Sequence, residues 1–198
     1  VSKMFTAEAV MMLKNEGKID YDVDIREYIP EWPYEGITTR LLLNHRSGLS
    51  RYESLADAKW PDRKQPFLNE EMIEYYVTHK PNPYFKPHGG FNYSNVNYAL
   101  LASIVERASV MPFADYMKTK IFEPLYMNDS YIYEMRPDTT VSLYIEDIVQ
   151  GYYTEKRRPM QAPNEYLNGV KGDKMMISNT GDRFKFWTAI AYGMLHPD

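Results

Sequence analysis

Apolar residues recur at helical spacing over most of this chain. Residues 3–16 are apolar around nearly the whole circumference of a helix, which predicts a helix buried on most sides. Similar spacing after a capping residue or a proline predicts further helices, so we expect a mainly helical chain. These helices are expected at residues 41–43, 70–78, 95–109 and 113–121, and from Asn179 or Thr180 onward.

The rest of the chain predicts loops and little sheet. Residues 49–68 are polar and carry Pro61 and Pro66, which favours a loop. Weak alternation at residues 130–134 and 144–154 predicts two strands. No repeat, low-complexity tract or linker interrupts the 198 residues, so we predict one domain over residues 1–198.

Composition narrows the classes of function. The formal net charge is −4 and the basic residues are scattered among the acidic ones, which argues against a nucleic-acid-binding protein. No apolar run approaches the ~18 residues of a membrane span. The chain has no cysteine, which excludes disulfides and thiolate nucleophiles, and its four histidines lack a metal-binding spacing. We therefore expect no metal and no cofactor.

Two polar features interrupt this helical pattern. Tyr93, Ser94 and Asn95 form a triplet at the start of the helix predicted for residues 95–109. A tyrosine and an asparagine two residues apart on a rigid helix start can transfer a proton and hold a substrate. Asn95 could equally cap the helix, and Tyr93 could be one of the eighteen tyrosines that pack in the fold. Lys3 opens the first helix, where a solvated lysine is the simpler interpretation.

Five segments, in chain order, carry a wider resemblance. They are residues 1–7 (VSKMFTA), 37–49 (ITTRLLLNHRSGL), 87–98 (PHGGFNYSNVNY), 121–127 (IFEPLYM) and 172–182 (GDKMMISNTGD). Together they resemble the motifs of the serine β-lactamase and penicillin-binding protein superfamily, in particular its class C β-lactamase, D-alanyl-D-alanine carboxypeptidase and esterase branch. The sequence departs from the family's pattern at three positions: Arg46, His88 and Tyr126.

The resemblance implies a fold class: mainly α, the helical lobe of the β-lactamase/transpeptidase-like α+β fold. Its S-x-x-K motif would place a serine directly before Val1, on the same helix face as Lys3. Its K-T-G or H-x-G strand, which lines the oxyanion hole, is not found in the 198 residues. We therefore expect residues 1–198 to be a partial domain, truncated at both ends, with the sheet lobe largely absent.

The resemblance also implies chemistry for the polar residues. A serine hydrolase of this type forms an acyl-enzyme on a β-lactam, D-alanyl peptide, ester or amide. Lys3 would be the base for acylation, Tyr93 its partner and the proton donor to the leaving group, and Asn95 the residue that positions substrate. His45 would brace the helix that carries the nucleophile. The implied partner is a small-molecule or peptide substrate, and the implied location is periplasmic or otherwise extracytoplasmic.

Two other functions stay open at this point. A non-catalytic sensor of peptides or penicillin-like ligands would have no serine before Val1. A helical interaction module would bind a partner through an exposed apolar surface. Lacking nucleophile and oxyanion strand, the chain by itself is expected to be inactive, and the face of its first helix around Phe5, Ala9 and Met12 is expected to be exposed. The oligomeric state is left open by the sequence.

Overall fold

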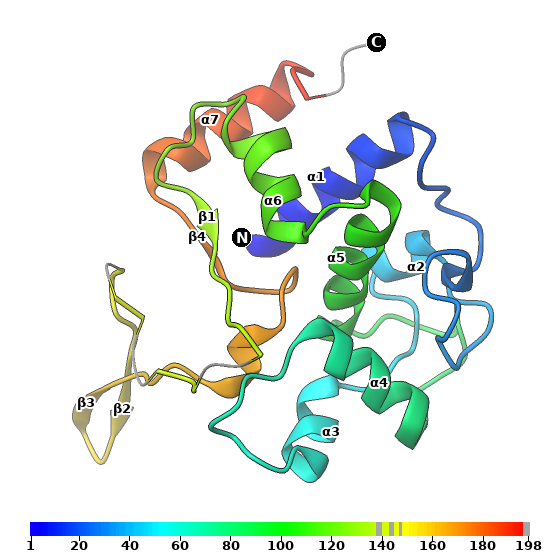
Figure 1. Cartoon of the computed structure of the whole chain (residues 1–198), viewed down its shortest axis with the longest axis horizontal. Helices are drawn as coiled ribbons and strands as arrows, with labels where there is room; N and C mark the ends of the chain where they lie inside the picture. The colour runs from blue at the N-terminus through cyan, green and yellow to red at the C-terminus, as the bar shows by residue number, and fades with distance from the viewer. Residues whose placement is uncertain (138–139, 143–144, 147, 196–198) are drawn as a thin grey trace.

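The computed structural model describes residues 1–137, 140–142, 145–146 and 148–195 of the chain. The helices in these ranges are α1 (Ser2–Asn15), α2 (Thr39–Leu43), α3 (Tyr52–Lys59), α4 (Asn69–His79), α5 (Asn95–Ser109), α6 (Phe113–Met117) and α7 (Thr180–Ala191), with single-turn segments η1 (Ile25–Glu27), η2 (Lys118–Phe122) and η3 (Tyr166–Gly169). α5 runs through the middle of the molecule, and α1, α2, α4 and α6 pack against it (Figure 1). The helix predicted for residues 113–121 is α6, continued by the π-helical turn η2.

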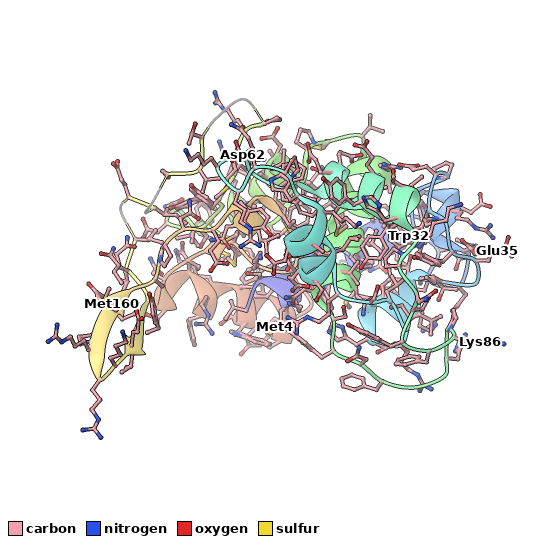
Figure 2. The ribbon with its side chains drawn as sticks, turned by 90° about the horizontal axis from the view of Figure 1, so that it is seen from below. Met4, Trp32, Glu35, Asp62, Lys86 and Met160 are labelled. Atoms are coloured by element: carbon pink, nitrogen blue, oxygen red, sulfur yellow. The ribbon has the colours of Figure 1, made fainter. Side chains whose placement is uncertain are left out.

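The strands form two small antiparallel sheets in the described part of the chain. β1 (Tyr131–Ile132) pairs with β4 (Met176–Ile177), and β2 (Tyr152–Glu155) pairs with β3 (Arg158–Gln161). β1 lies in the first segment predicted from alternation, and β2 overlaps the second, of which Tyr144 and Asp147 lie outside the described residues. Figure 2 shows Met160 of the β2–β3 hairpin at the edge of the molecule, and Figure 1 shows this hairpin set apart from the helices. Helices combined with these small sheets make an α+β arrangement.

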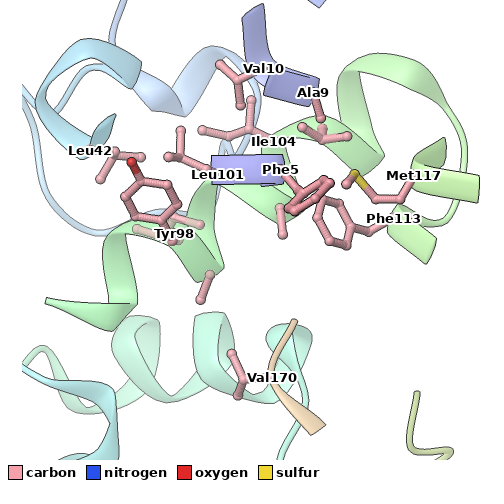
Figure 3. Packing of buried hydrophobic residues seen from close by; sticks show 14 of the residues in the cluster. Phe5, Ala9, Val10, Leu42, Tyr98, Leu101, Ile104, Phe113, Met117 and Val170 are labelled. Carbon is pink, nitrogen blue, oxygen red and sulfur yellow. The ribbon is translucent and has the colours of Figure 1, made fainter. Parts of the chain in front are cut away.

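α5 supplies the centre of the core. Its predicted bounds, residues 95–109, are confirmed. Residues 96–105 are buried without a break, so the helix is covered on every side rather than along one stripe. Figure 3 shows Leu101 and Ile104 of α5 grouped with Val10 of α1. None of the helices in the described ranges is both long enough and apolar enough to cross a bilayer.

The face of α1 that was expected to be exposed is buried. Phe5 is 1% exposed, and its ring stacks on Phe186 of α7 with centroids 3.7 Å apart. The same ring meets Phe122 edge-on at 6.0 Å. Ala9 is fully buried and Met12 is half-buried. The expectation is therefore wrong, because α5 and α6 pack against α1 and α7 contributes Phe186 as a partner of Phe5.

α3 occupies part of the loop predicted for residues 49–68. Tyr52, Leu55 and Ala56 have the spacing of one helix face, and Tyr52 and Ala56 are fully buried. The polar residues around them and the following prolines obscured this short signal. The missed helix matters because Glu53, in its first turn, belongs to the candidate site.

Candidate active site

Lys3 is held by segments that are distant in the sequence. It lies half-buried in the first turn of α1. Its Nζ donates to Asn95 Oδ1 at 2.7 Å and to the backbone carbonyl of Asp173 at 2.9 Å. The ring centroids of Tyr93 and Tyr98 lie 5.0 and 5.7 Å from Nζ, which is cation–π range. Lys3 is therefore a fixed group and not a freely solvated lysine.

The structure brings Lys3, Tyr93 and Asn95 together. Ser94 is the N-cap of α5 and has an extended backbone with φ −140°. Tyr93 therefore lies just outside the helix, and Asn95 lies in its first turn. The Asn95 side chain does not cap the helix but bonds to Lys3 and Glu53. The interpretation of Asn95 as a simple helix cap is wrong.

Glu53 of α3 sets the orientation of the Asn95 amide. Its Oε1 accepts a hydrogen bond from Asn95 Nδ2 at 2.7 Å. An ionised carboxylate can only accept, so the amide nitrogen must face Glu53, which leaves Oδ1 for the Lys3 amine. The Glu53 side chain is 15% exposed, and its Oε2 lies 3.7 Å from Arg51 Nε. The sequence pattern predicted neither α3 nor a role for Glu53.

A tight turn at Gly172 and Asp173 brings a carbonyl to Lys3. Gly172 has φ +95°, and a Cβ there would lie 2.4 Å from the Tyr98 carbonyl oxygen, so the turn requires glycine. Thr6 Oγ1 of α1 donates to the Gly172 carbonyl at 2.8 Å. These contacts fix the Asp173 carbonyl at the end of the Lys3 side chain.

The Asp173 side chain is a buried acid beside the site. Its Oδ2 accepts the hydroxyl of Tyr52 at 2.9 Å. Burial raises the pKa of Asp173 to about 6, against the opposing effects of Lys174, the Tyr52 hydrogen bond and Lys3. Asp173 belongs to the fifth segment that carries the resemblance, but its contacts with Tyr52 and Lys3 could not be predicted, because these partners lie far from it along the chain.

Neither serine near Lys3 is placed as a nucleophile. Ser2 Oγ accepts the backbone N–H of Met176 at 3.3 Å. Ser94 Oγ is enclosed and makes no hydrogen bond in the structure. Tyr93, in contrast, is 58% exposed, so the site opens to solvent on the side of the phenol. No cluster of three or more histidine, aspartate or glutamate side chains in the described ranges is arranged to hold a metal ion.

Comparisons with known proteins show the family of this chain. The sequence model of the Beta-lactamase family matches residues 1–193, and the chain belongs to that family. It is 35% identical to Penicillin-binding protein 4* of Bacillus subtilis (strain 168), over 96% of this chain and 43% of that protein. It is 29% identical to the human mitochondrial Serine beta-lactamase-like protein LACTB, over 98% of this chain and 46% of that protein. The chain thus spans less than half the length of both curated relatives.

A solved structure has a similar fold. The D-amino acid amidase from Ochrobactrum anthropi SV3, complexed with L-phenylalanine amide, superposes with a TM-score of 0.80 and 26% identity. The match covers 98% of this chain and 54% of that chain. The fold is therefore that of the α+β transpeptidase-like proteins, and the superfamily is one of serine hydrolases.

Proposed function

We propose that this chain is the helical part of a serine hydrolase of the β-lactamase and penicillin-binding type, with Lys3 as the base of acylation. The observation that carries the proposal is the pair of hydrogen bonds from Lys3 Nζ to Asn95 Oδ1 and the Asp173 carbonyl. To act as a base, Lys3 must be a neutral amine, which has two hydrogens and one lone pair. With both hydrogens directed at these two acceptors, the lone pair would point in the remaining direction, where it could take a proton.

The proposed reaction proceeds in two steps. A serine hydroxyl attacks the substrate carbonyl, its proton passes to the Lys3 amine, and an acyl-enzyme forms when the leaving group departs. Tyr93, whose ring lies 5.0 Å from Nζ, relays a proton to that leaving group. Water then attacks the acyl-enzyme and releases the acid. Asn95 both holds Lys3 and faces the substrate.

The nucleophile and the oxyanion hole belong to the remainder of the proposed protein. The S-x-x-K spacing puts the serine directly before Val1, one helical turn from Lys3. The described residues contain only the two small sheets β1–β4 and β2–β3, which supports a chain that is mainly the helical lobe of a partial domain. The 198 residues alone are therefore expected to lack acyl-transfer activity.

The substrate class follows from the names of the similar proteins. One is a penicillin-binding protein and another is a D-amino acid amidase, so we propose β-lactams, D-alanyl peptides, esters or amides as substrates. An extracytoplasmic location is proposed for a bacterial protein of this kind, whereas the human relative is named as mitochondrial.

The proposal is tested with the full-length protein, a chromogenic cephalosporin, p-nitrophenyl acetate and D-phenylalanine p-nitroanilide. Burst kinetics followed by steady turnover on at least one probe are expected, and none from the 198 residues alone. Binding of the cephalosporin without acylation of the protein would favour the sensor, which would have no serine before Val1. Neither binding nor acylation would leave the interaction module as the better account.

A further inference from the structure

His45 holds the chain on both sides of Tyr93. It follows α2 with a left-handed backbone, φ 55°, and is 8% exposed. Its backbone carbonyl accepts the N–H of Asn92 at 3.0 Å, and its ring nitrogen Nδ1 accepts the N–H of Ser94 at 3.3 Å. Between these two bonds the imidazole packs against Tyr93, with ring centroids 4.5 Å apart. One histidine thus fixes the backbone and the ring of the residue proposed to transfer protons.

Hydrogen bonding also defines the protonation state of this ring. Asn97 Nδ2 lies 3.1 Å from the same Nδ1 that receives the Ser94 N–H. The Asn97 amide is oriented by Ser47, whose hydroxyl donates to Asn97 Oδ1 at 2.6 Å. Two donors therefore point at Nδ1, which must present a lone pair. The proton lies on Nε2, and the imidazole is neutral.

Burial and charge also favour the neutral imidazole. The titratable side chains that face the ring are Lys3, Tyr93 and Tyr98. Burial, followed by the positive charge of Lys3, lowers the pKa of His45. A proton on Nδ1 would also turn an N–H against two other N–H groups. His45 is therefore kept as a neutral acceptor.

We propose that His45 is a positioning residue for Tyr93, and that its unprotonated Nδ1 holds the turn at residues 92–94 with the Tyr93 ring beside the Lys3 amine. The inference rests on the proposed role of Tyr93 in proton transfer. In this proposal His45 positions the turn at residues 92–94 and does not brace the helix that carries the nucleophile. Misplacement of a reacting group by about 1 Å can cost about 10²-fold in rate, so this turn matters for turnover.

The test compares two replacements of His45 in the full-length protein, with p-nitrophenyl acetate as the probe. His45→Asn tolerates the left-handed backbone and keeps an acceptor, Oδ1, near the place of Nδ1. His45→Phe keeps a ring of similar size and removes the acceptor. We expect His45→Phe to lower kcat about 10-fold or more with KM little changed, and His45→Asn to stay within about threefold of wild type. His79→Asn, at an exposed position of α4, is the control and should have no effect.

A second measurement does not depend on activity or on a variant. The 15N NMR spectrum of the wild type should show His45 with an unprotonated Nδ1 and a protonated Nε2 at neutral pH. A proton on Nδ1 would overturn the inference. Full activity of His45→Phe, with Tyr93→Phe impaired, would also overturn it and leave the proposed function intact. Full activity of Tyr93→Phe would instead remove the proposed role of Tyr93, and the positioning role of His45 with it.

Discussion

Asn95 joins Lys3 to Glu53 through the two ends of one amide. Its Oδ1 lies 2.7 Å from Lys3 Nζ, and its Nδ2 lies 2.7 Å from Glu53 Oε1. The three residues come from α5, α1 and α3, so the position of the lysine depends on the packing of three helices. A carboxylate behind the asparagine prevents the amide from turning its nitrogen toward the lysine.

This chain of contacts predicts different effects for two replacements of Glu53. Glu53→Leu leaves Asn95 Nδ2 without its acceptor, so the amide can rotate and release Lys3. We expect kcat/KM of the full-length protein toward p-nitrophenyl acetate to fall about 10-fold or more. Glu53→Gln keeps an acceptor oxygen, and its effect should be within about threefold. Equal activities of both variants would mean that Glu53 does not act through Asn95.

Tyr93→Phe should lower turnover by about 10²-fold or more, since it removes one hydroxyl that handles protons. The phenol is 58% exposed and makes no hydrogen bond in the described structure, so the loss should leave the fold unchanged. Steady-state kinetics of the full-length protein with p-nitrophenyl acetate and a chromogenic cephalosporin provide the measurement, and circular dichroism checks the fold. Tyr84→Phe, at a similarly exposed tyrosine, is the matched control. Unchanged hydrolysis of both probes by Tyr93→Phe would exclude Tyr93 from the mechanism.

Ionisation of the buried Asp173 side chain should lower the free energy of unfolding as the pH rises. Burial raises its pKa from the ordinary 3.8 to about 6, so between these pH values the folded state binds more protons than the unfolded state. The free energy of unfolding must then fall as pH rises through that window. The side chain of Asp173→Asn cannot ionise, so the variant should not show this pH dependence. Between pH 4 and pH 7, the free energy of unfolding of the wild type should therefore fall by about 2 kcal/mol relative to that of the variant. Urea unfolding of both proteins at several pH values measures the difference, and parallel curves would contradict the raised pKa.

The contact between α1 and α7 predicts a stability difference between two phenylalanines. Phe5 is 1% exposed and stacks on Phe186, so Phe5→Ala should cost about 3 to 5 kcal/mol of unfolding free energy. Phe184 lies on the outer side of α7 and is 72% exposed, and Phe184→Ala should change stability by less than about 0.5 kcal/mol. Thermal or urea unfolding compares the pair. A small effect of Phe5→Ala would mean that the Phe5 ring is not buried against Phe186 in solution.

The sequence predicted those parts of the fold that depend on local pattern. The bounds of α5 follow from an apolar run flanked by polar residues, and they match the structure. α3 was missed because its helix face is only Tyr52, Leu55 and Ala56 within a polar segment rich in prolines. The burial of Phe5 was also missed, since its partner Phe186 lies at the other end of the chain.

The candidate site could be predicted only in part, for a related reason. Lys3, Tyr93 and Asn95 stand in motif-like segments, so spacing and resemblance point to them. Glu53 stands in no such segment, and Asp173 stands in the fifth segment, where nothing in the local pattern shows that its carbonyl reaches Lys3. Glu53 contacts Asn95, which lies 42 positions away in the sequence, and the Asp173 carbonyl contacts Lys3, which lies 170 positions away. No periodicity in the sequence encodes such pairings. Their roles become visible only when the helices are packed.

Lys3 is proposed to activate a serine directly before Val1. The most direct measurement is peptide mass spectrometry of the full-length protein after incubation with a fluorophosphonate, which bonds covalently to activated serines. We predict one adduct, on the serine that precedes Val1, formed at least about 10²-fold more slowly in Lys3→Met and at the wild-type rate in Lys14→Met, an exposed lysine of the same helix. An adduct on Ser2 or Ser94, or labelling at the wild-type rate in Lys3→Met, would contradict the account.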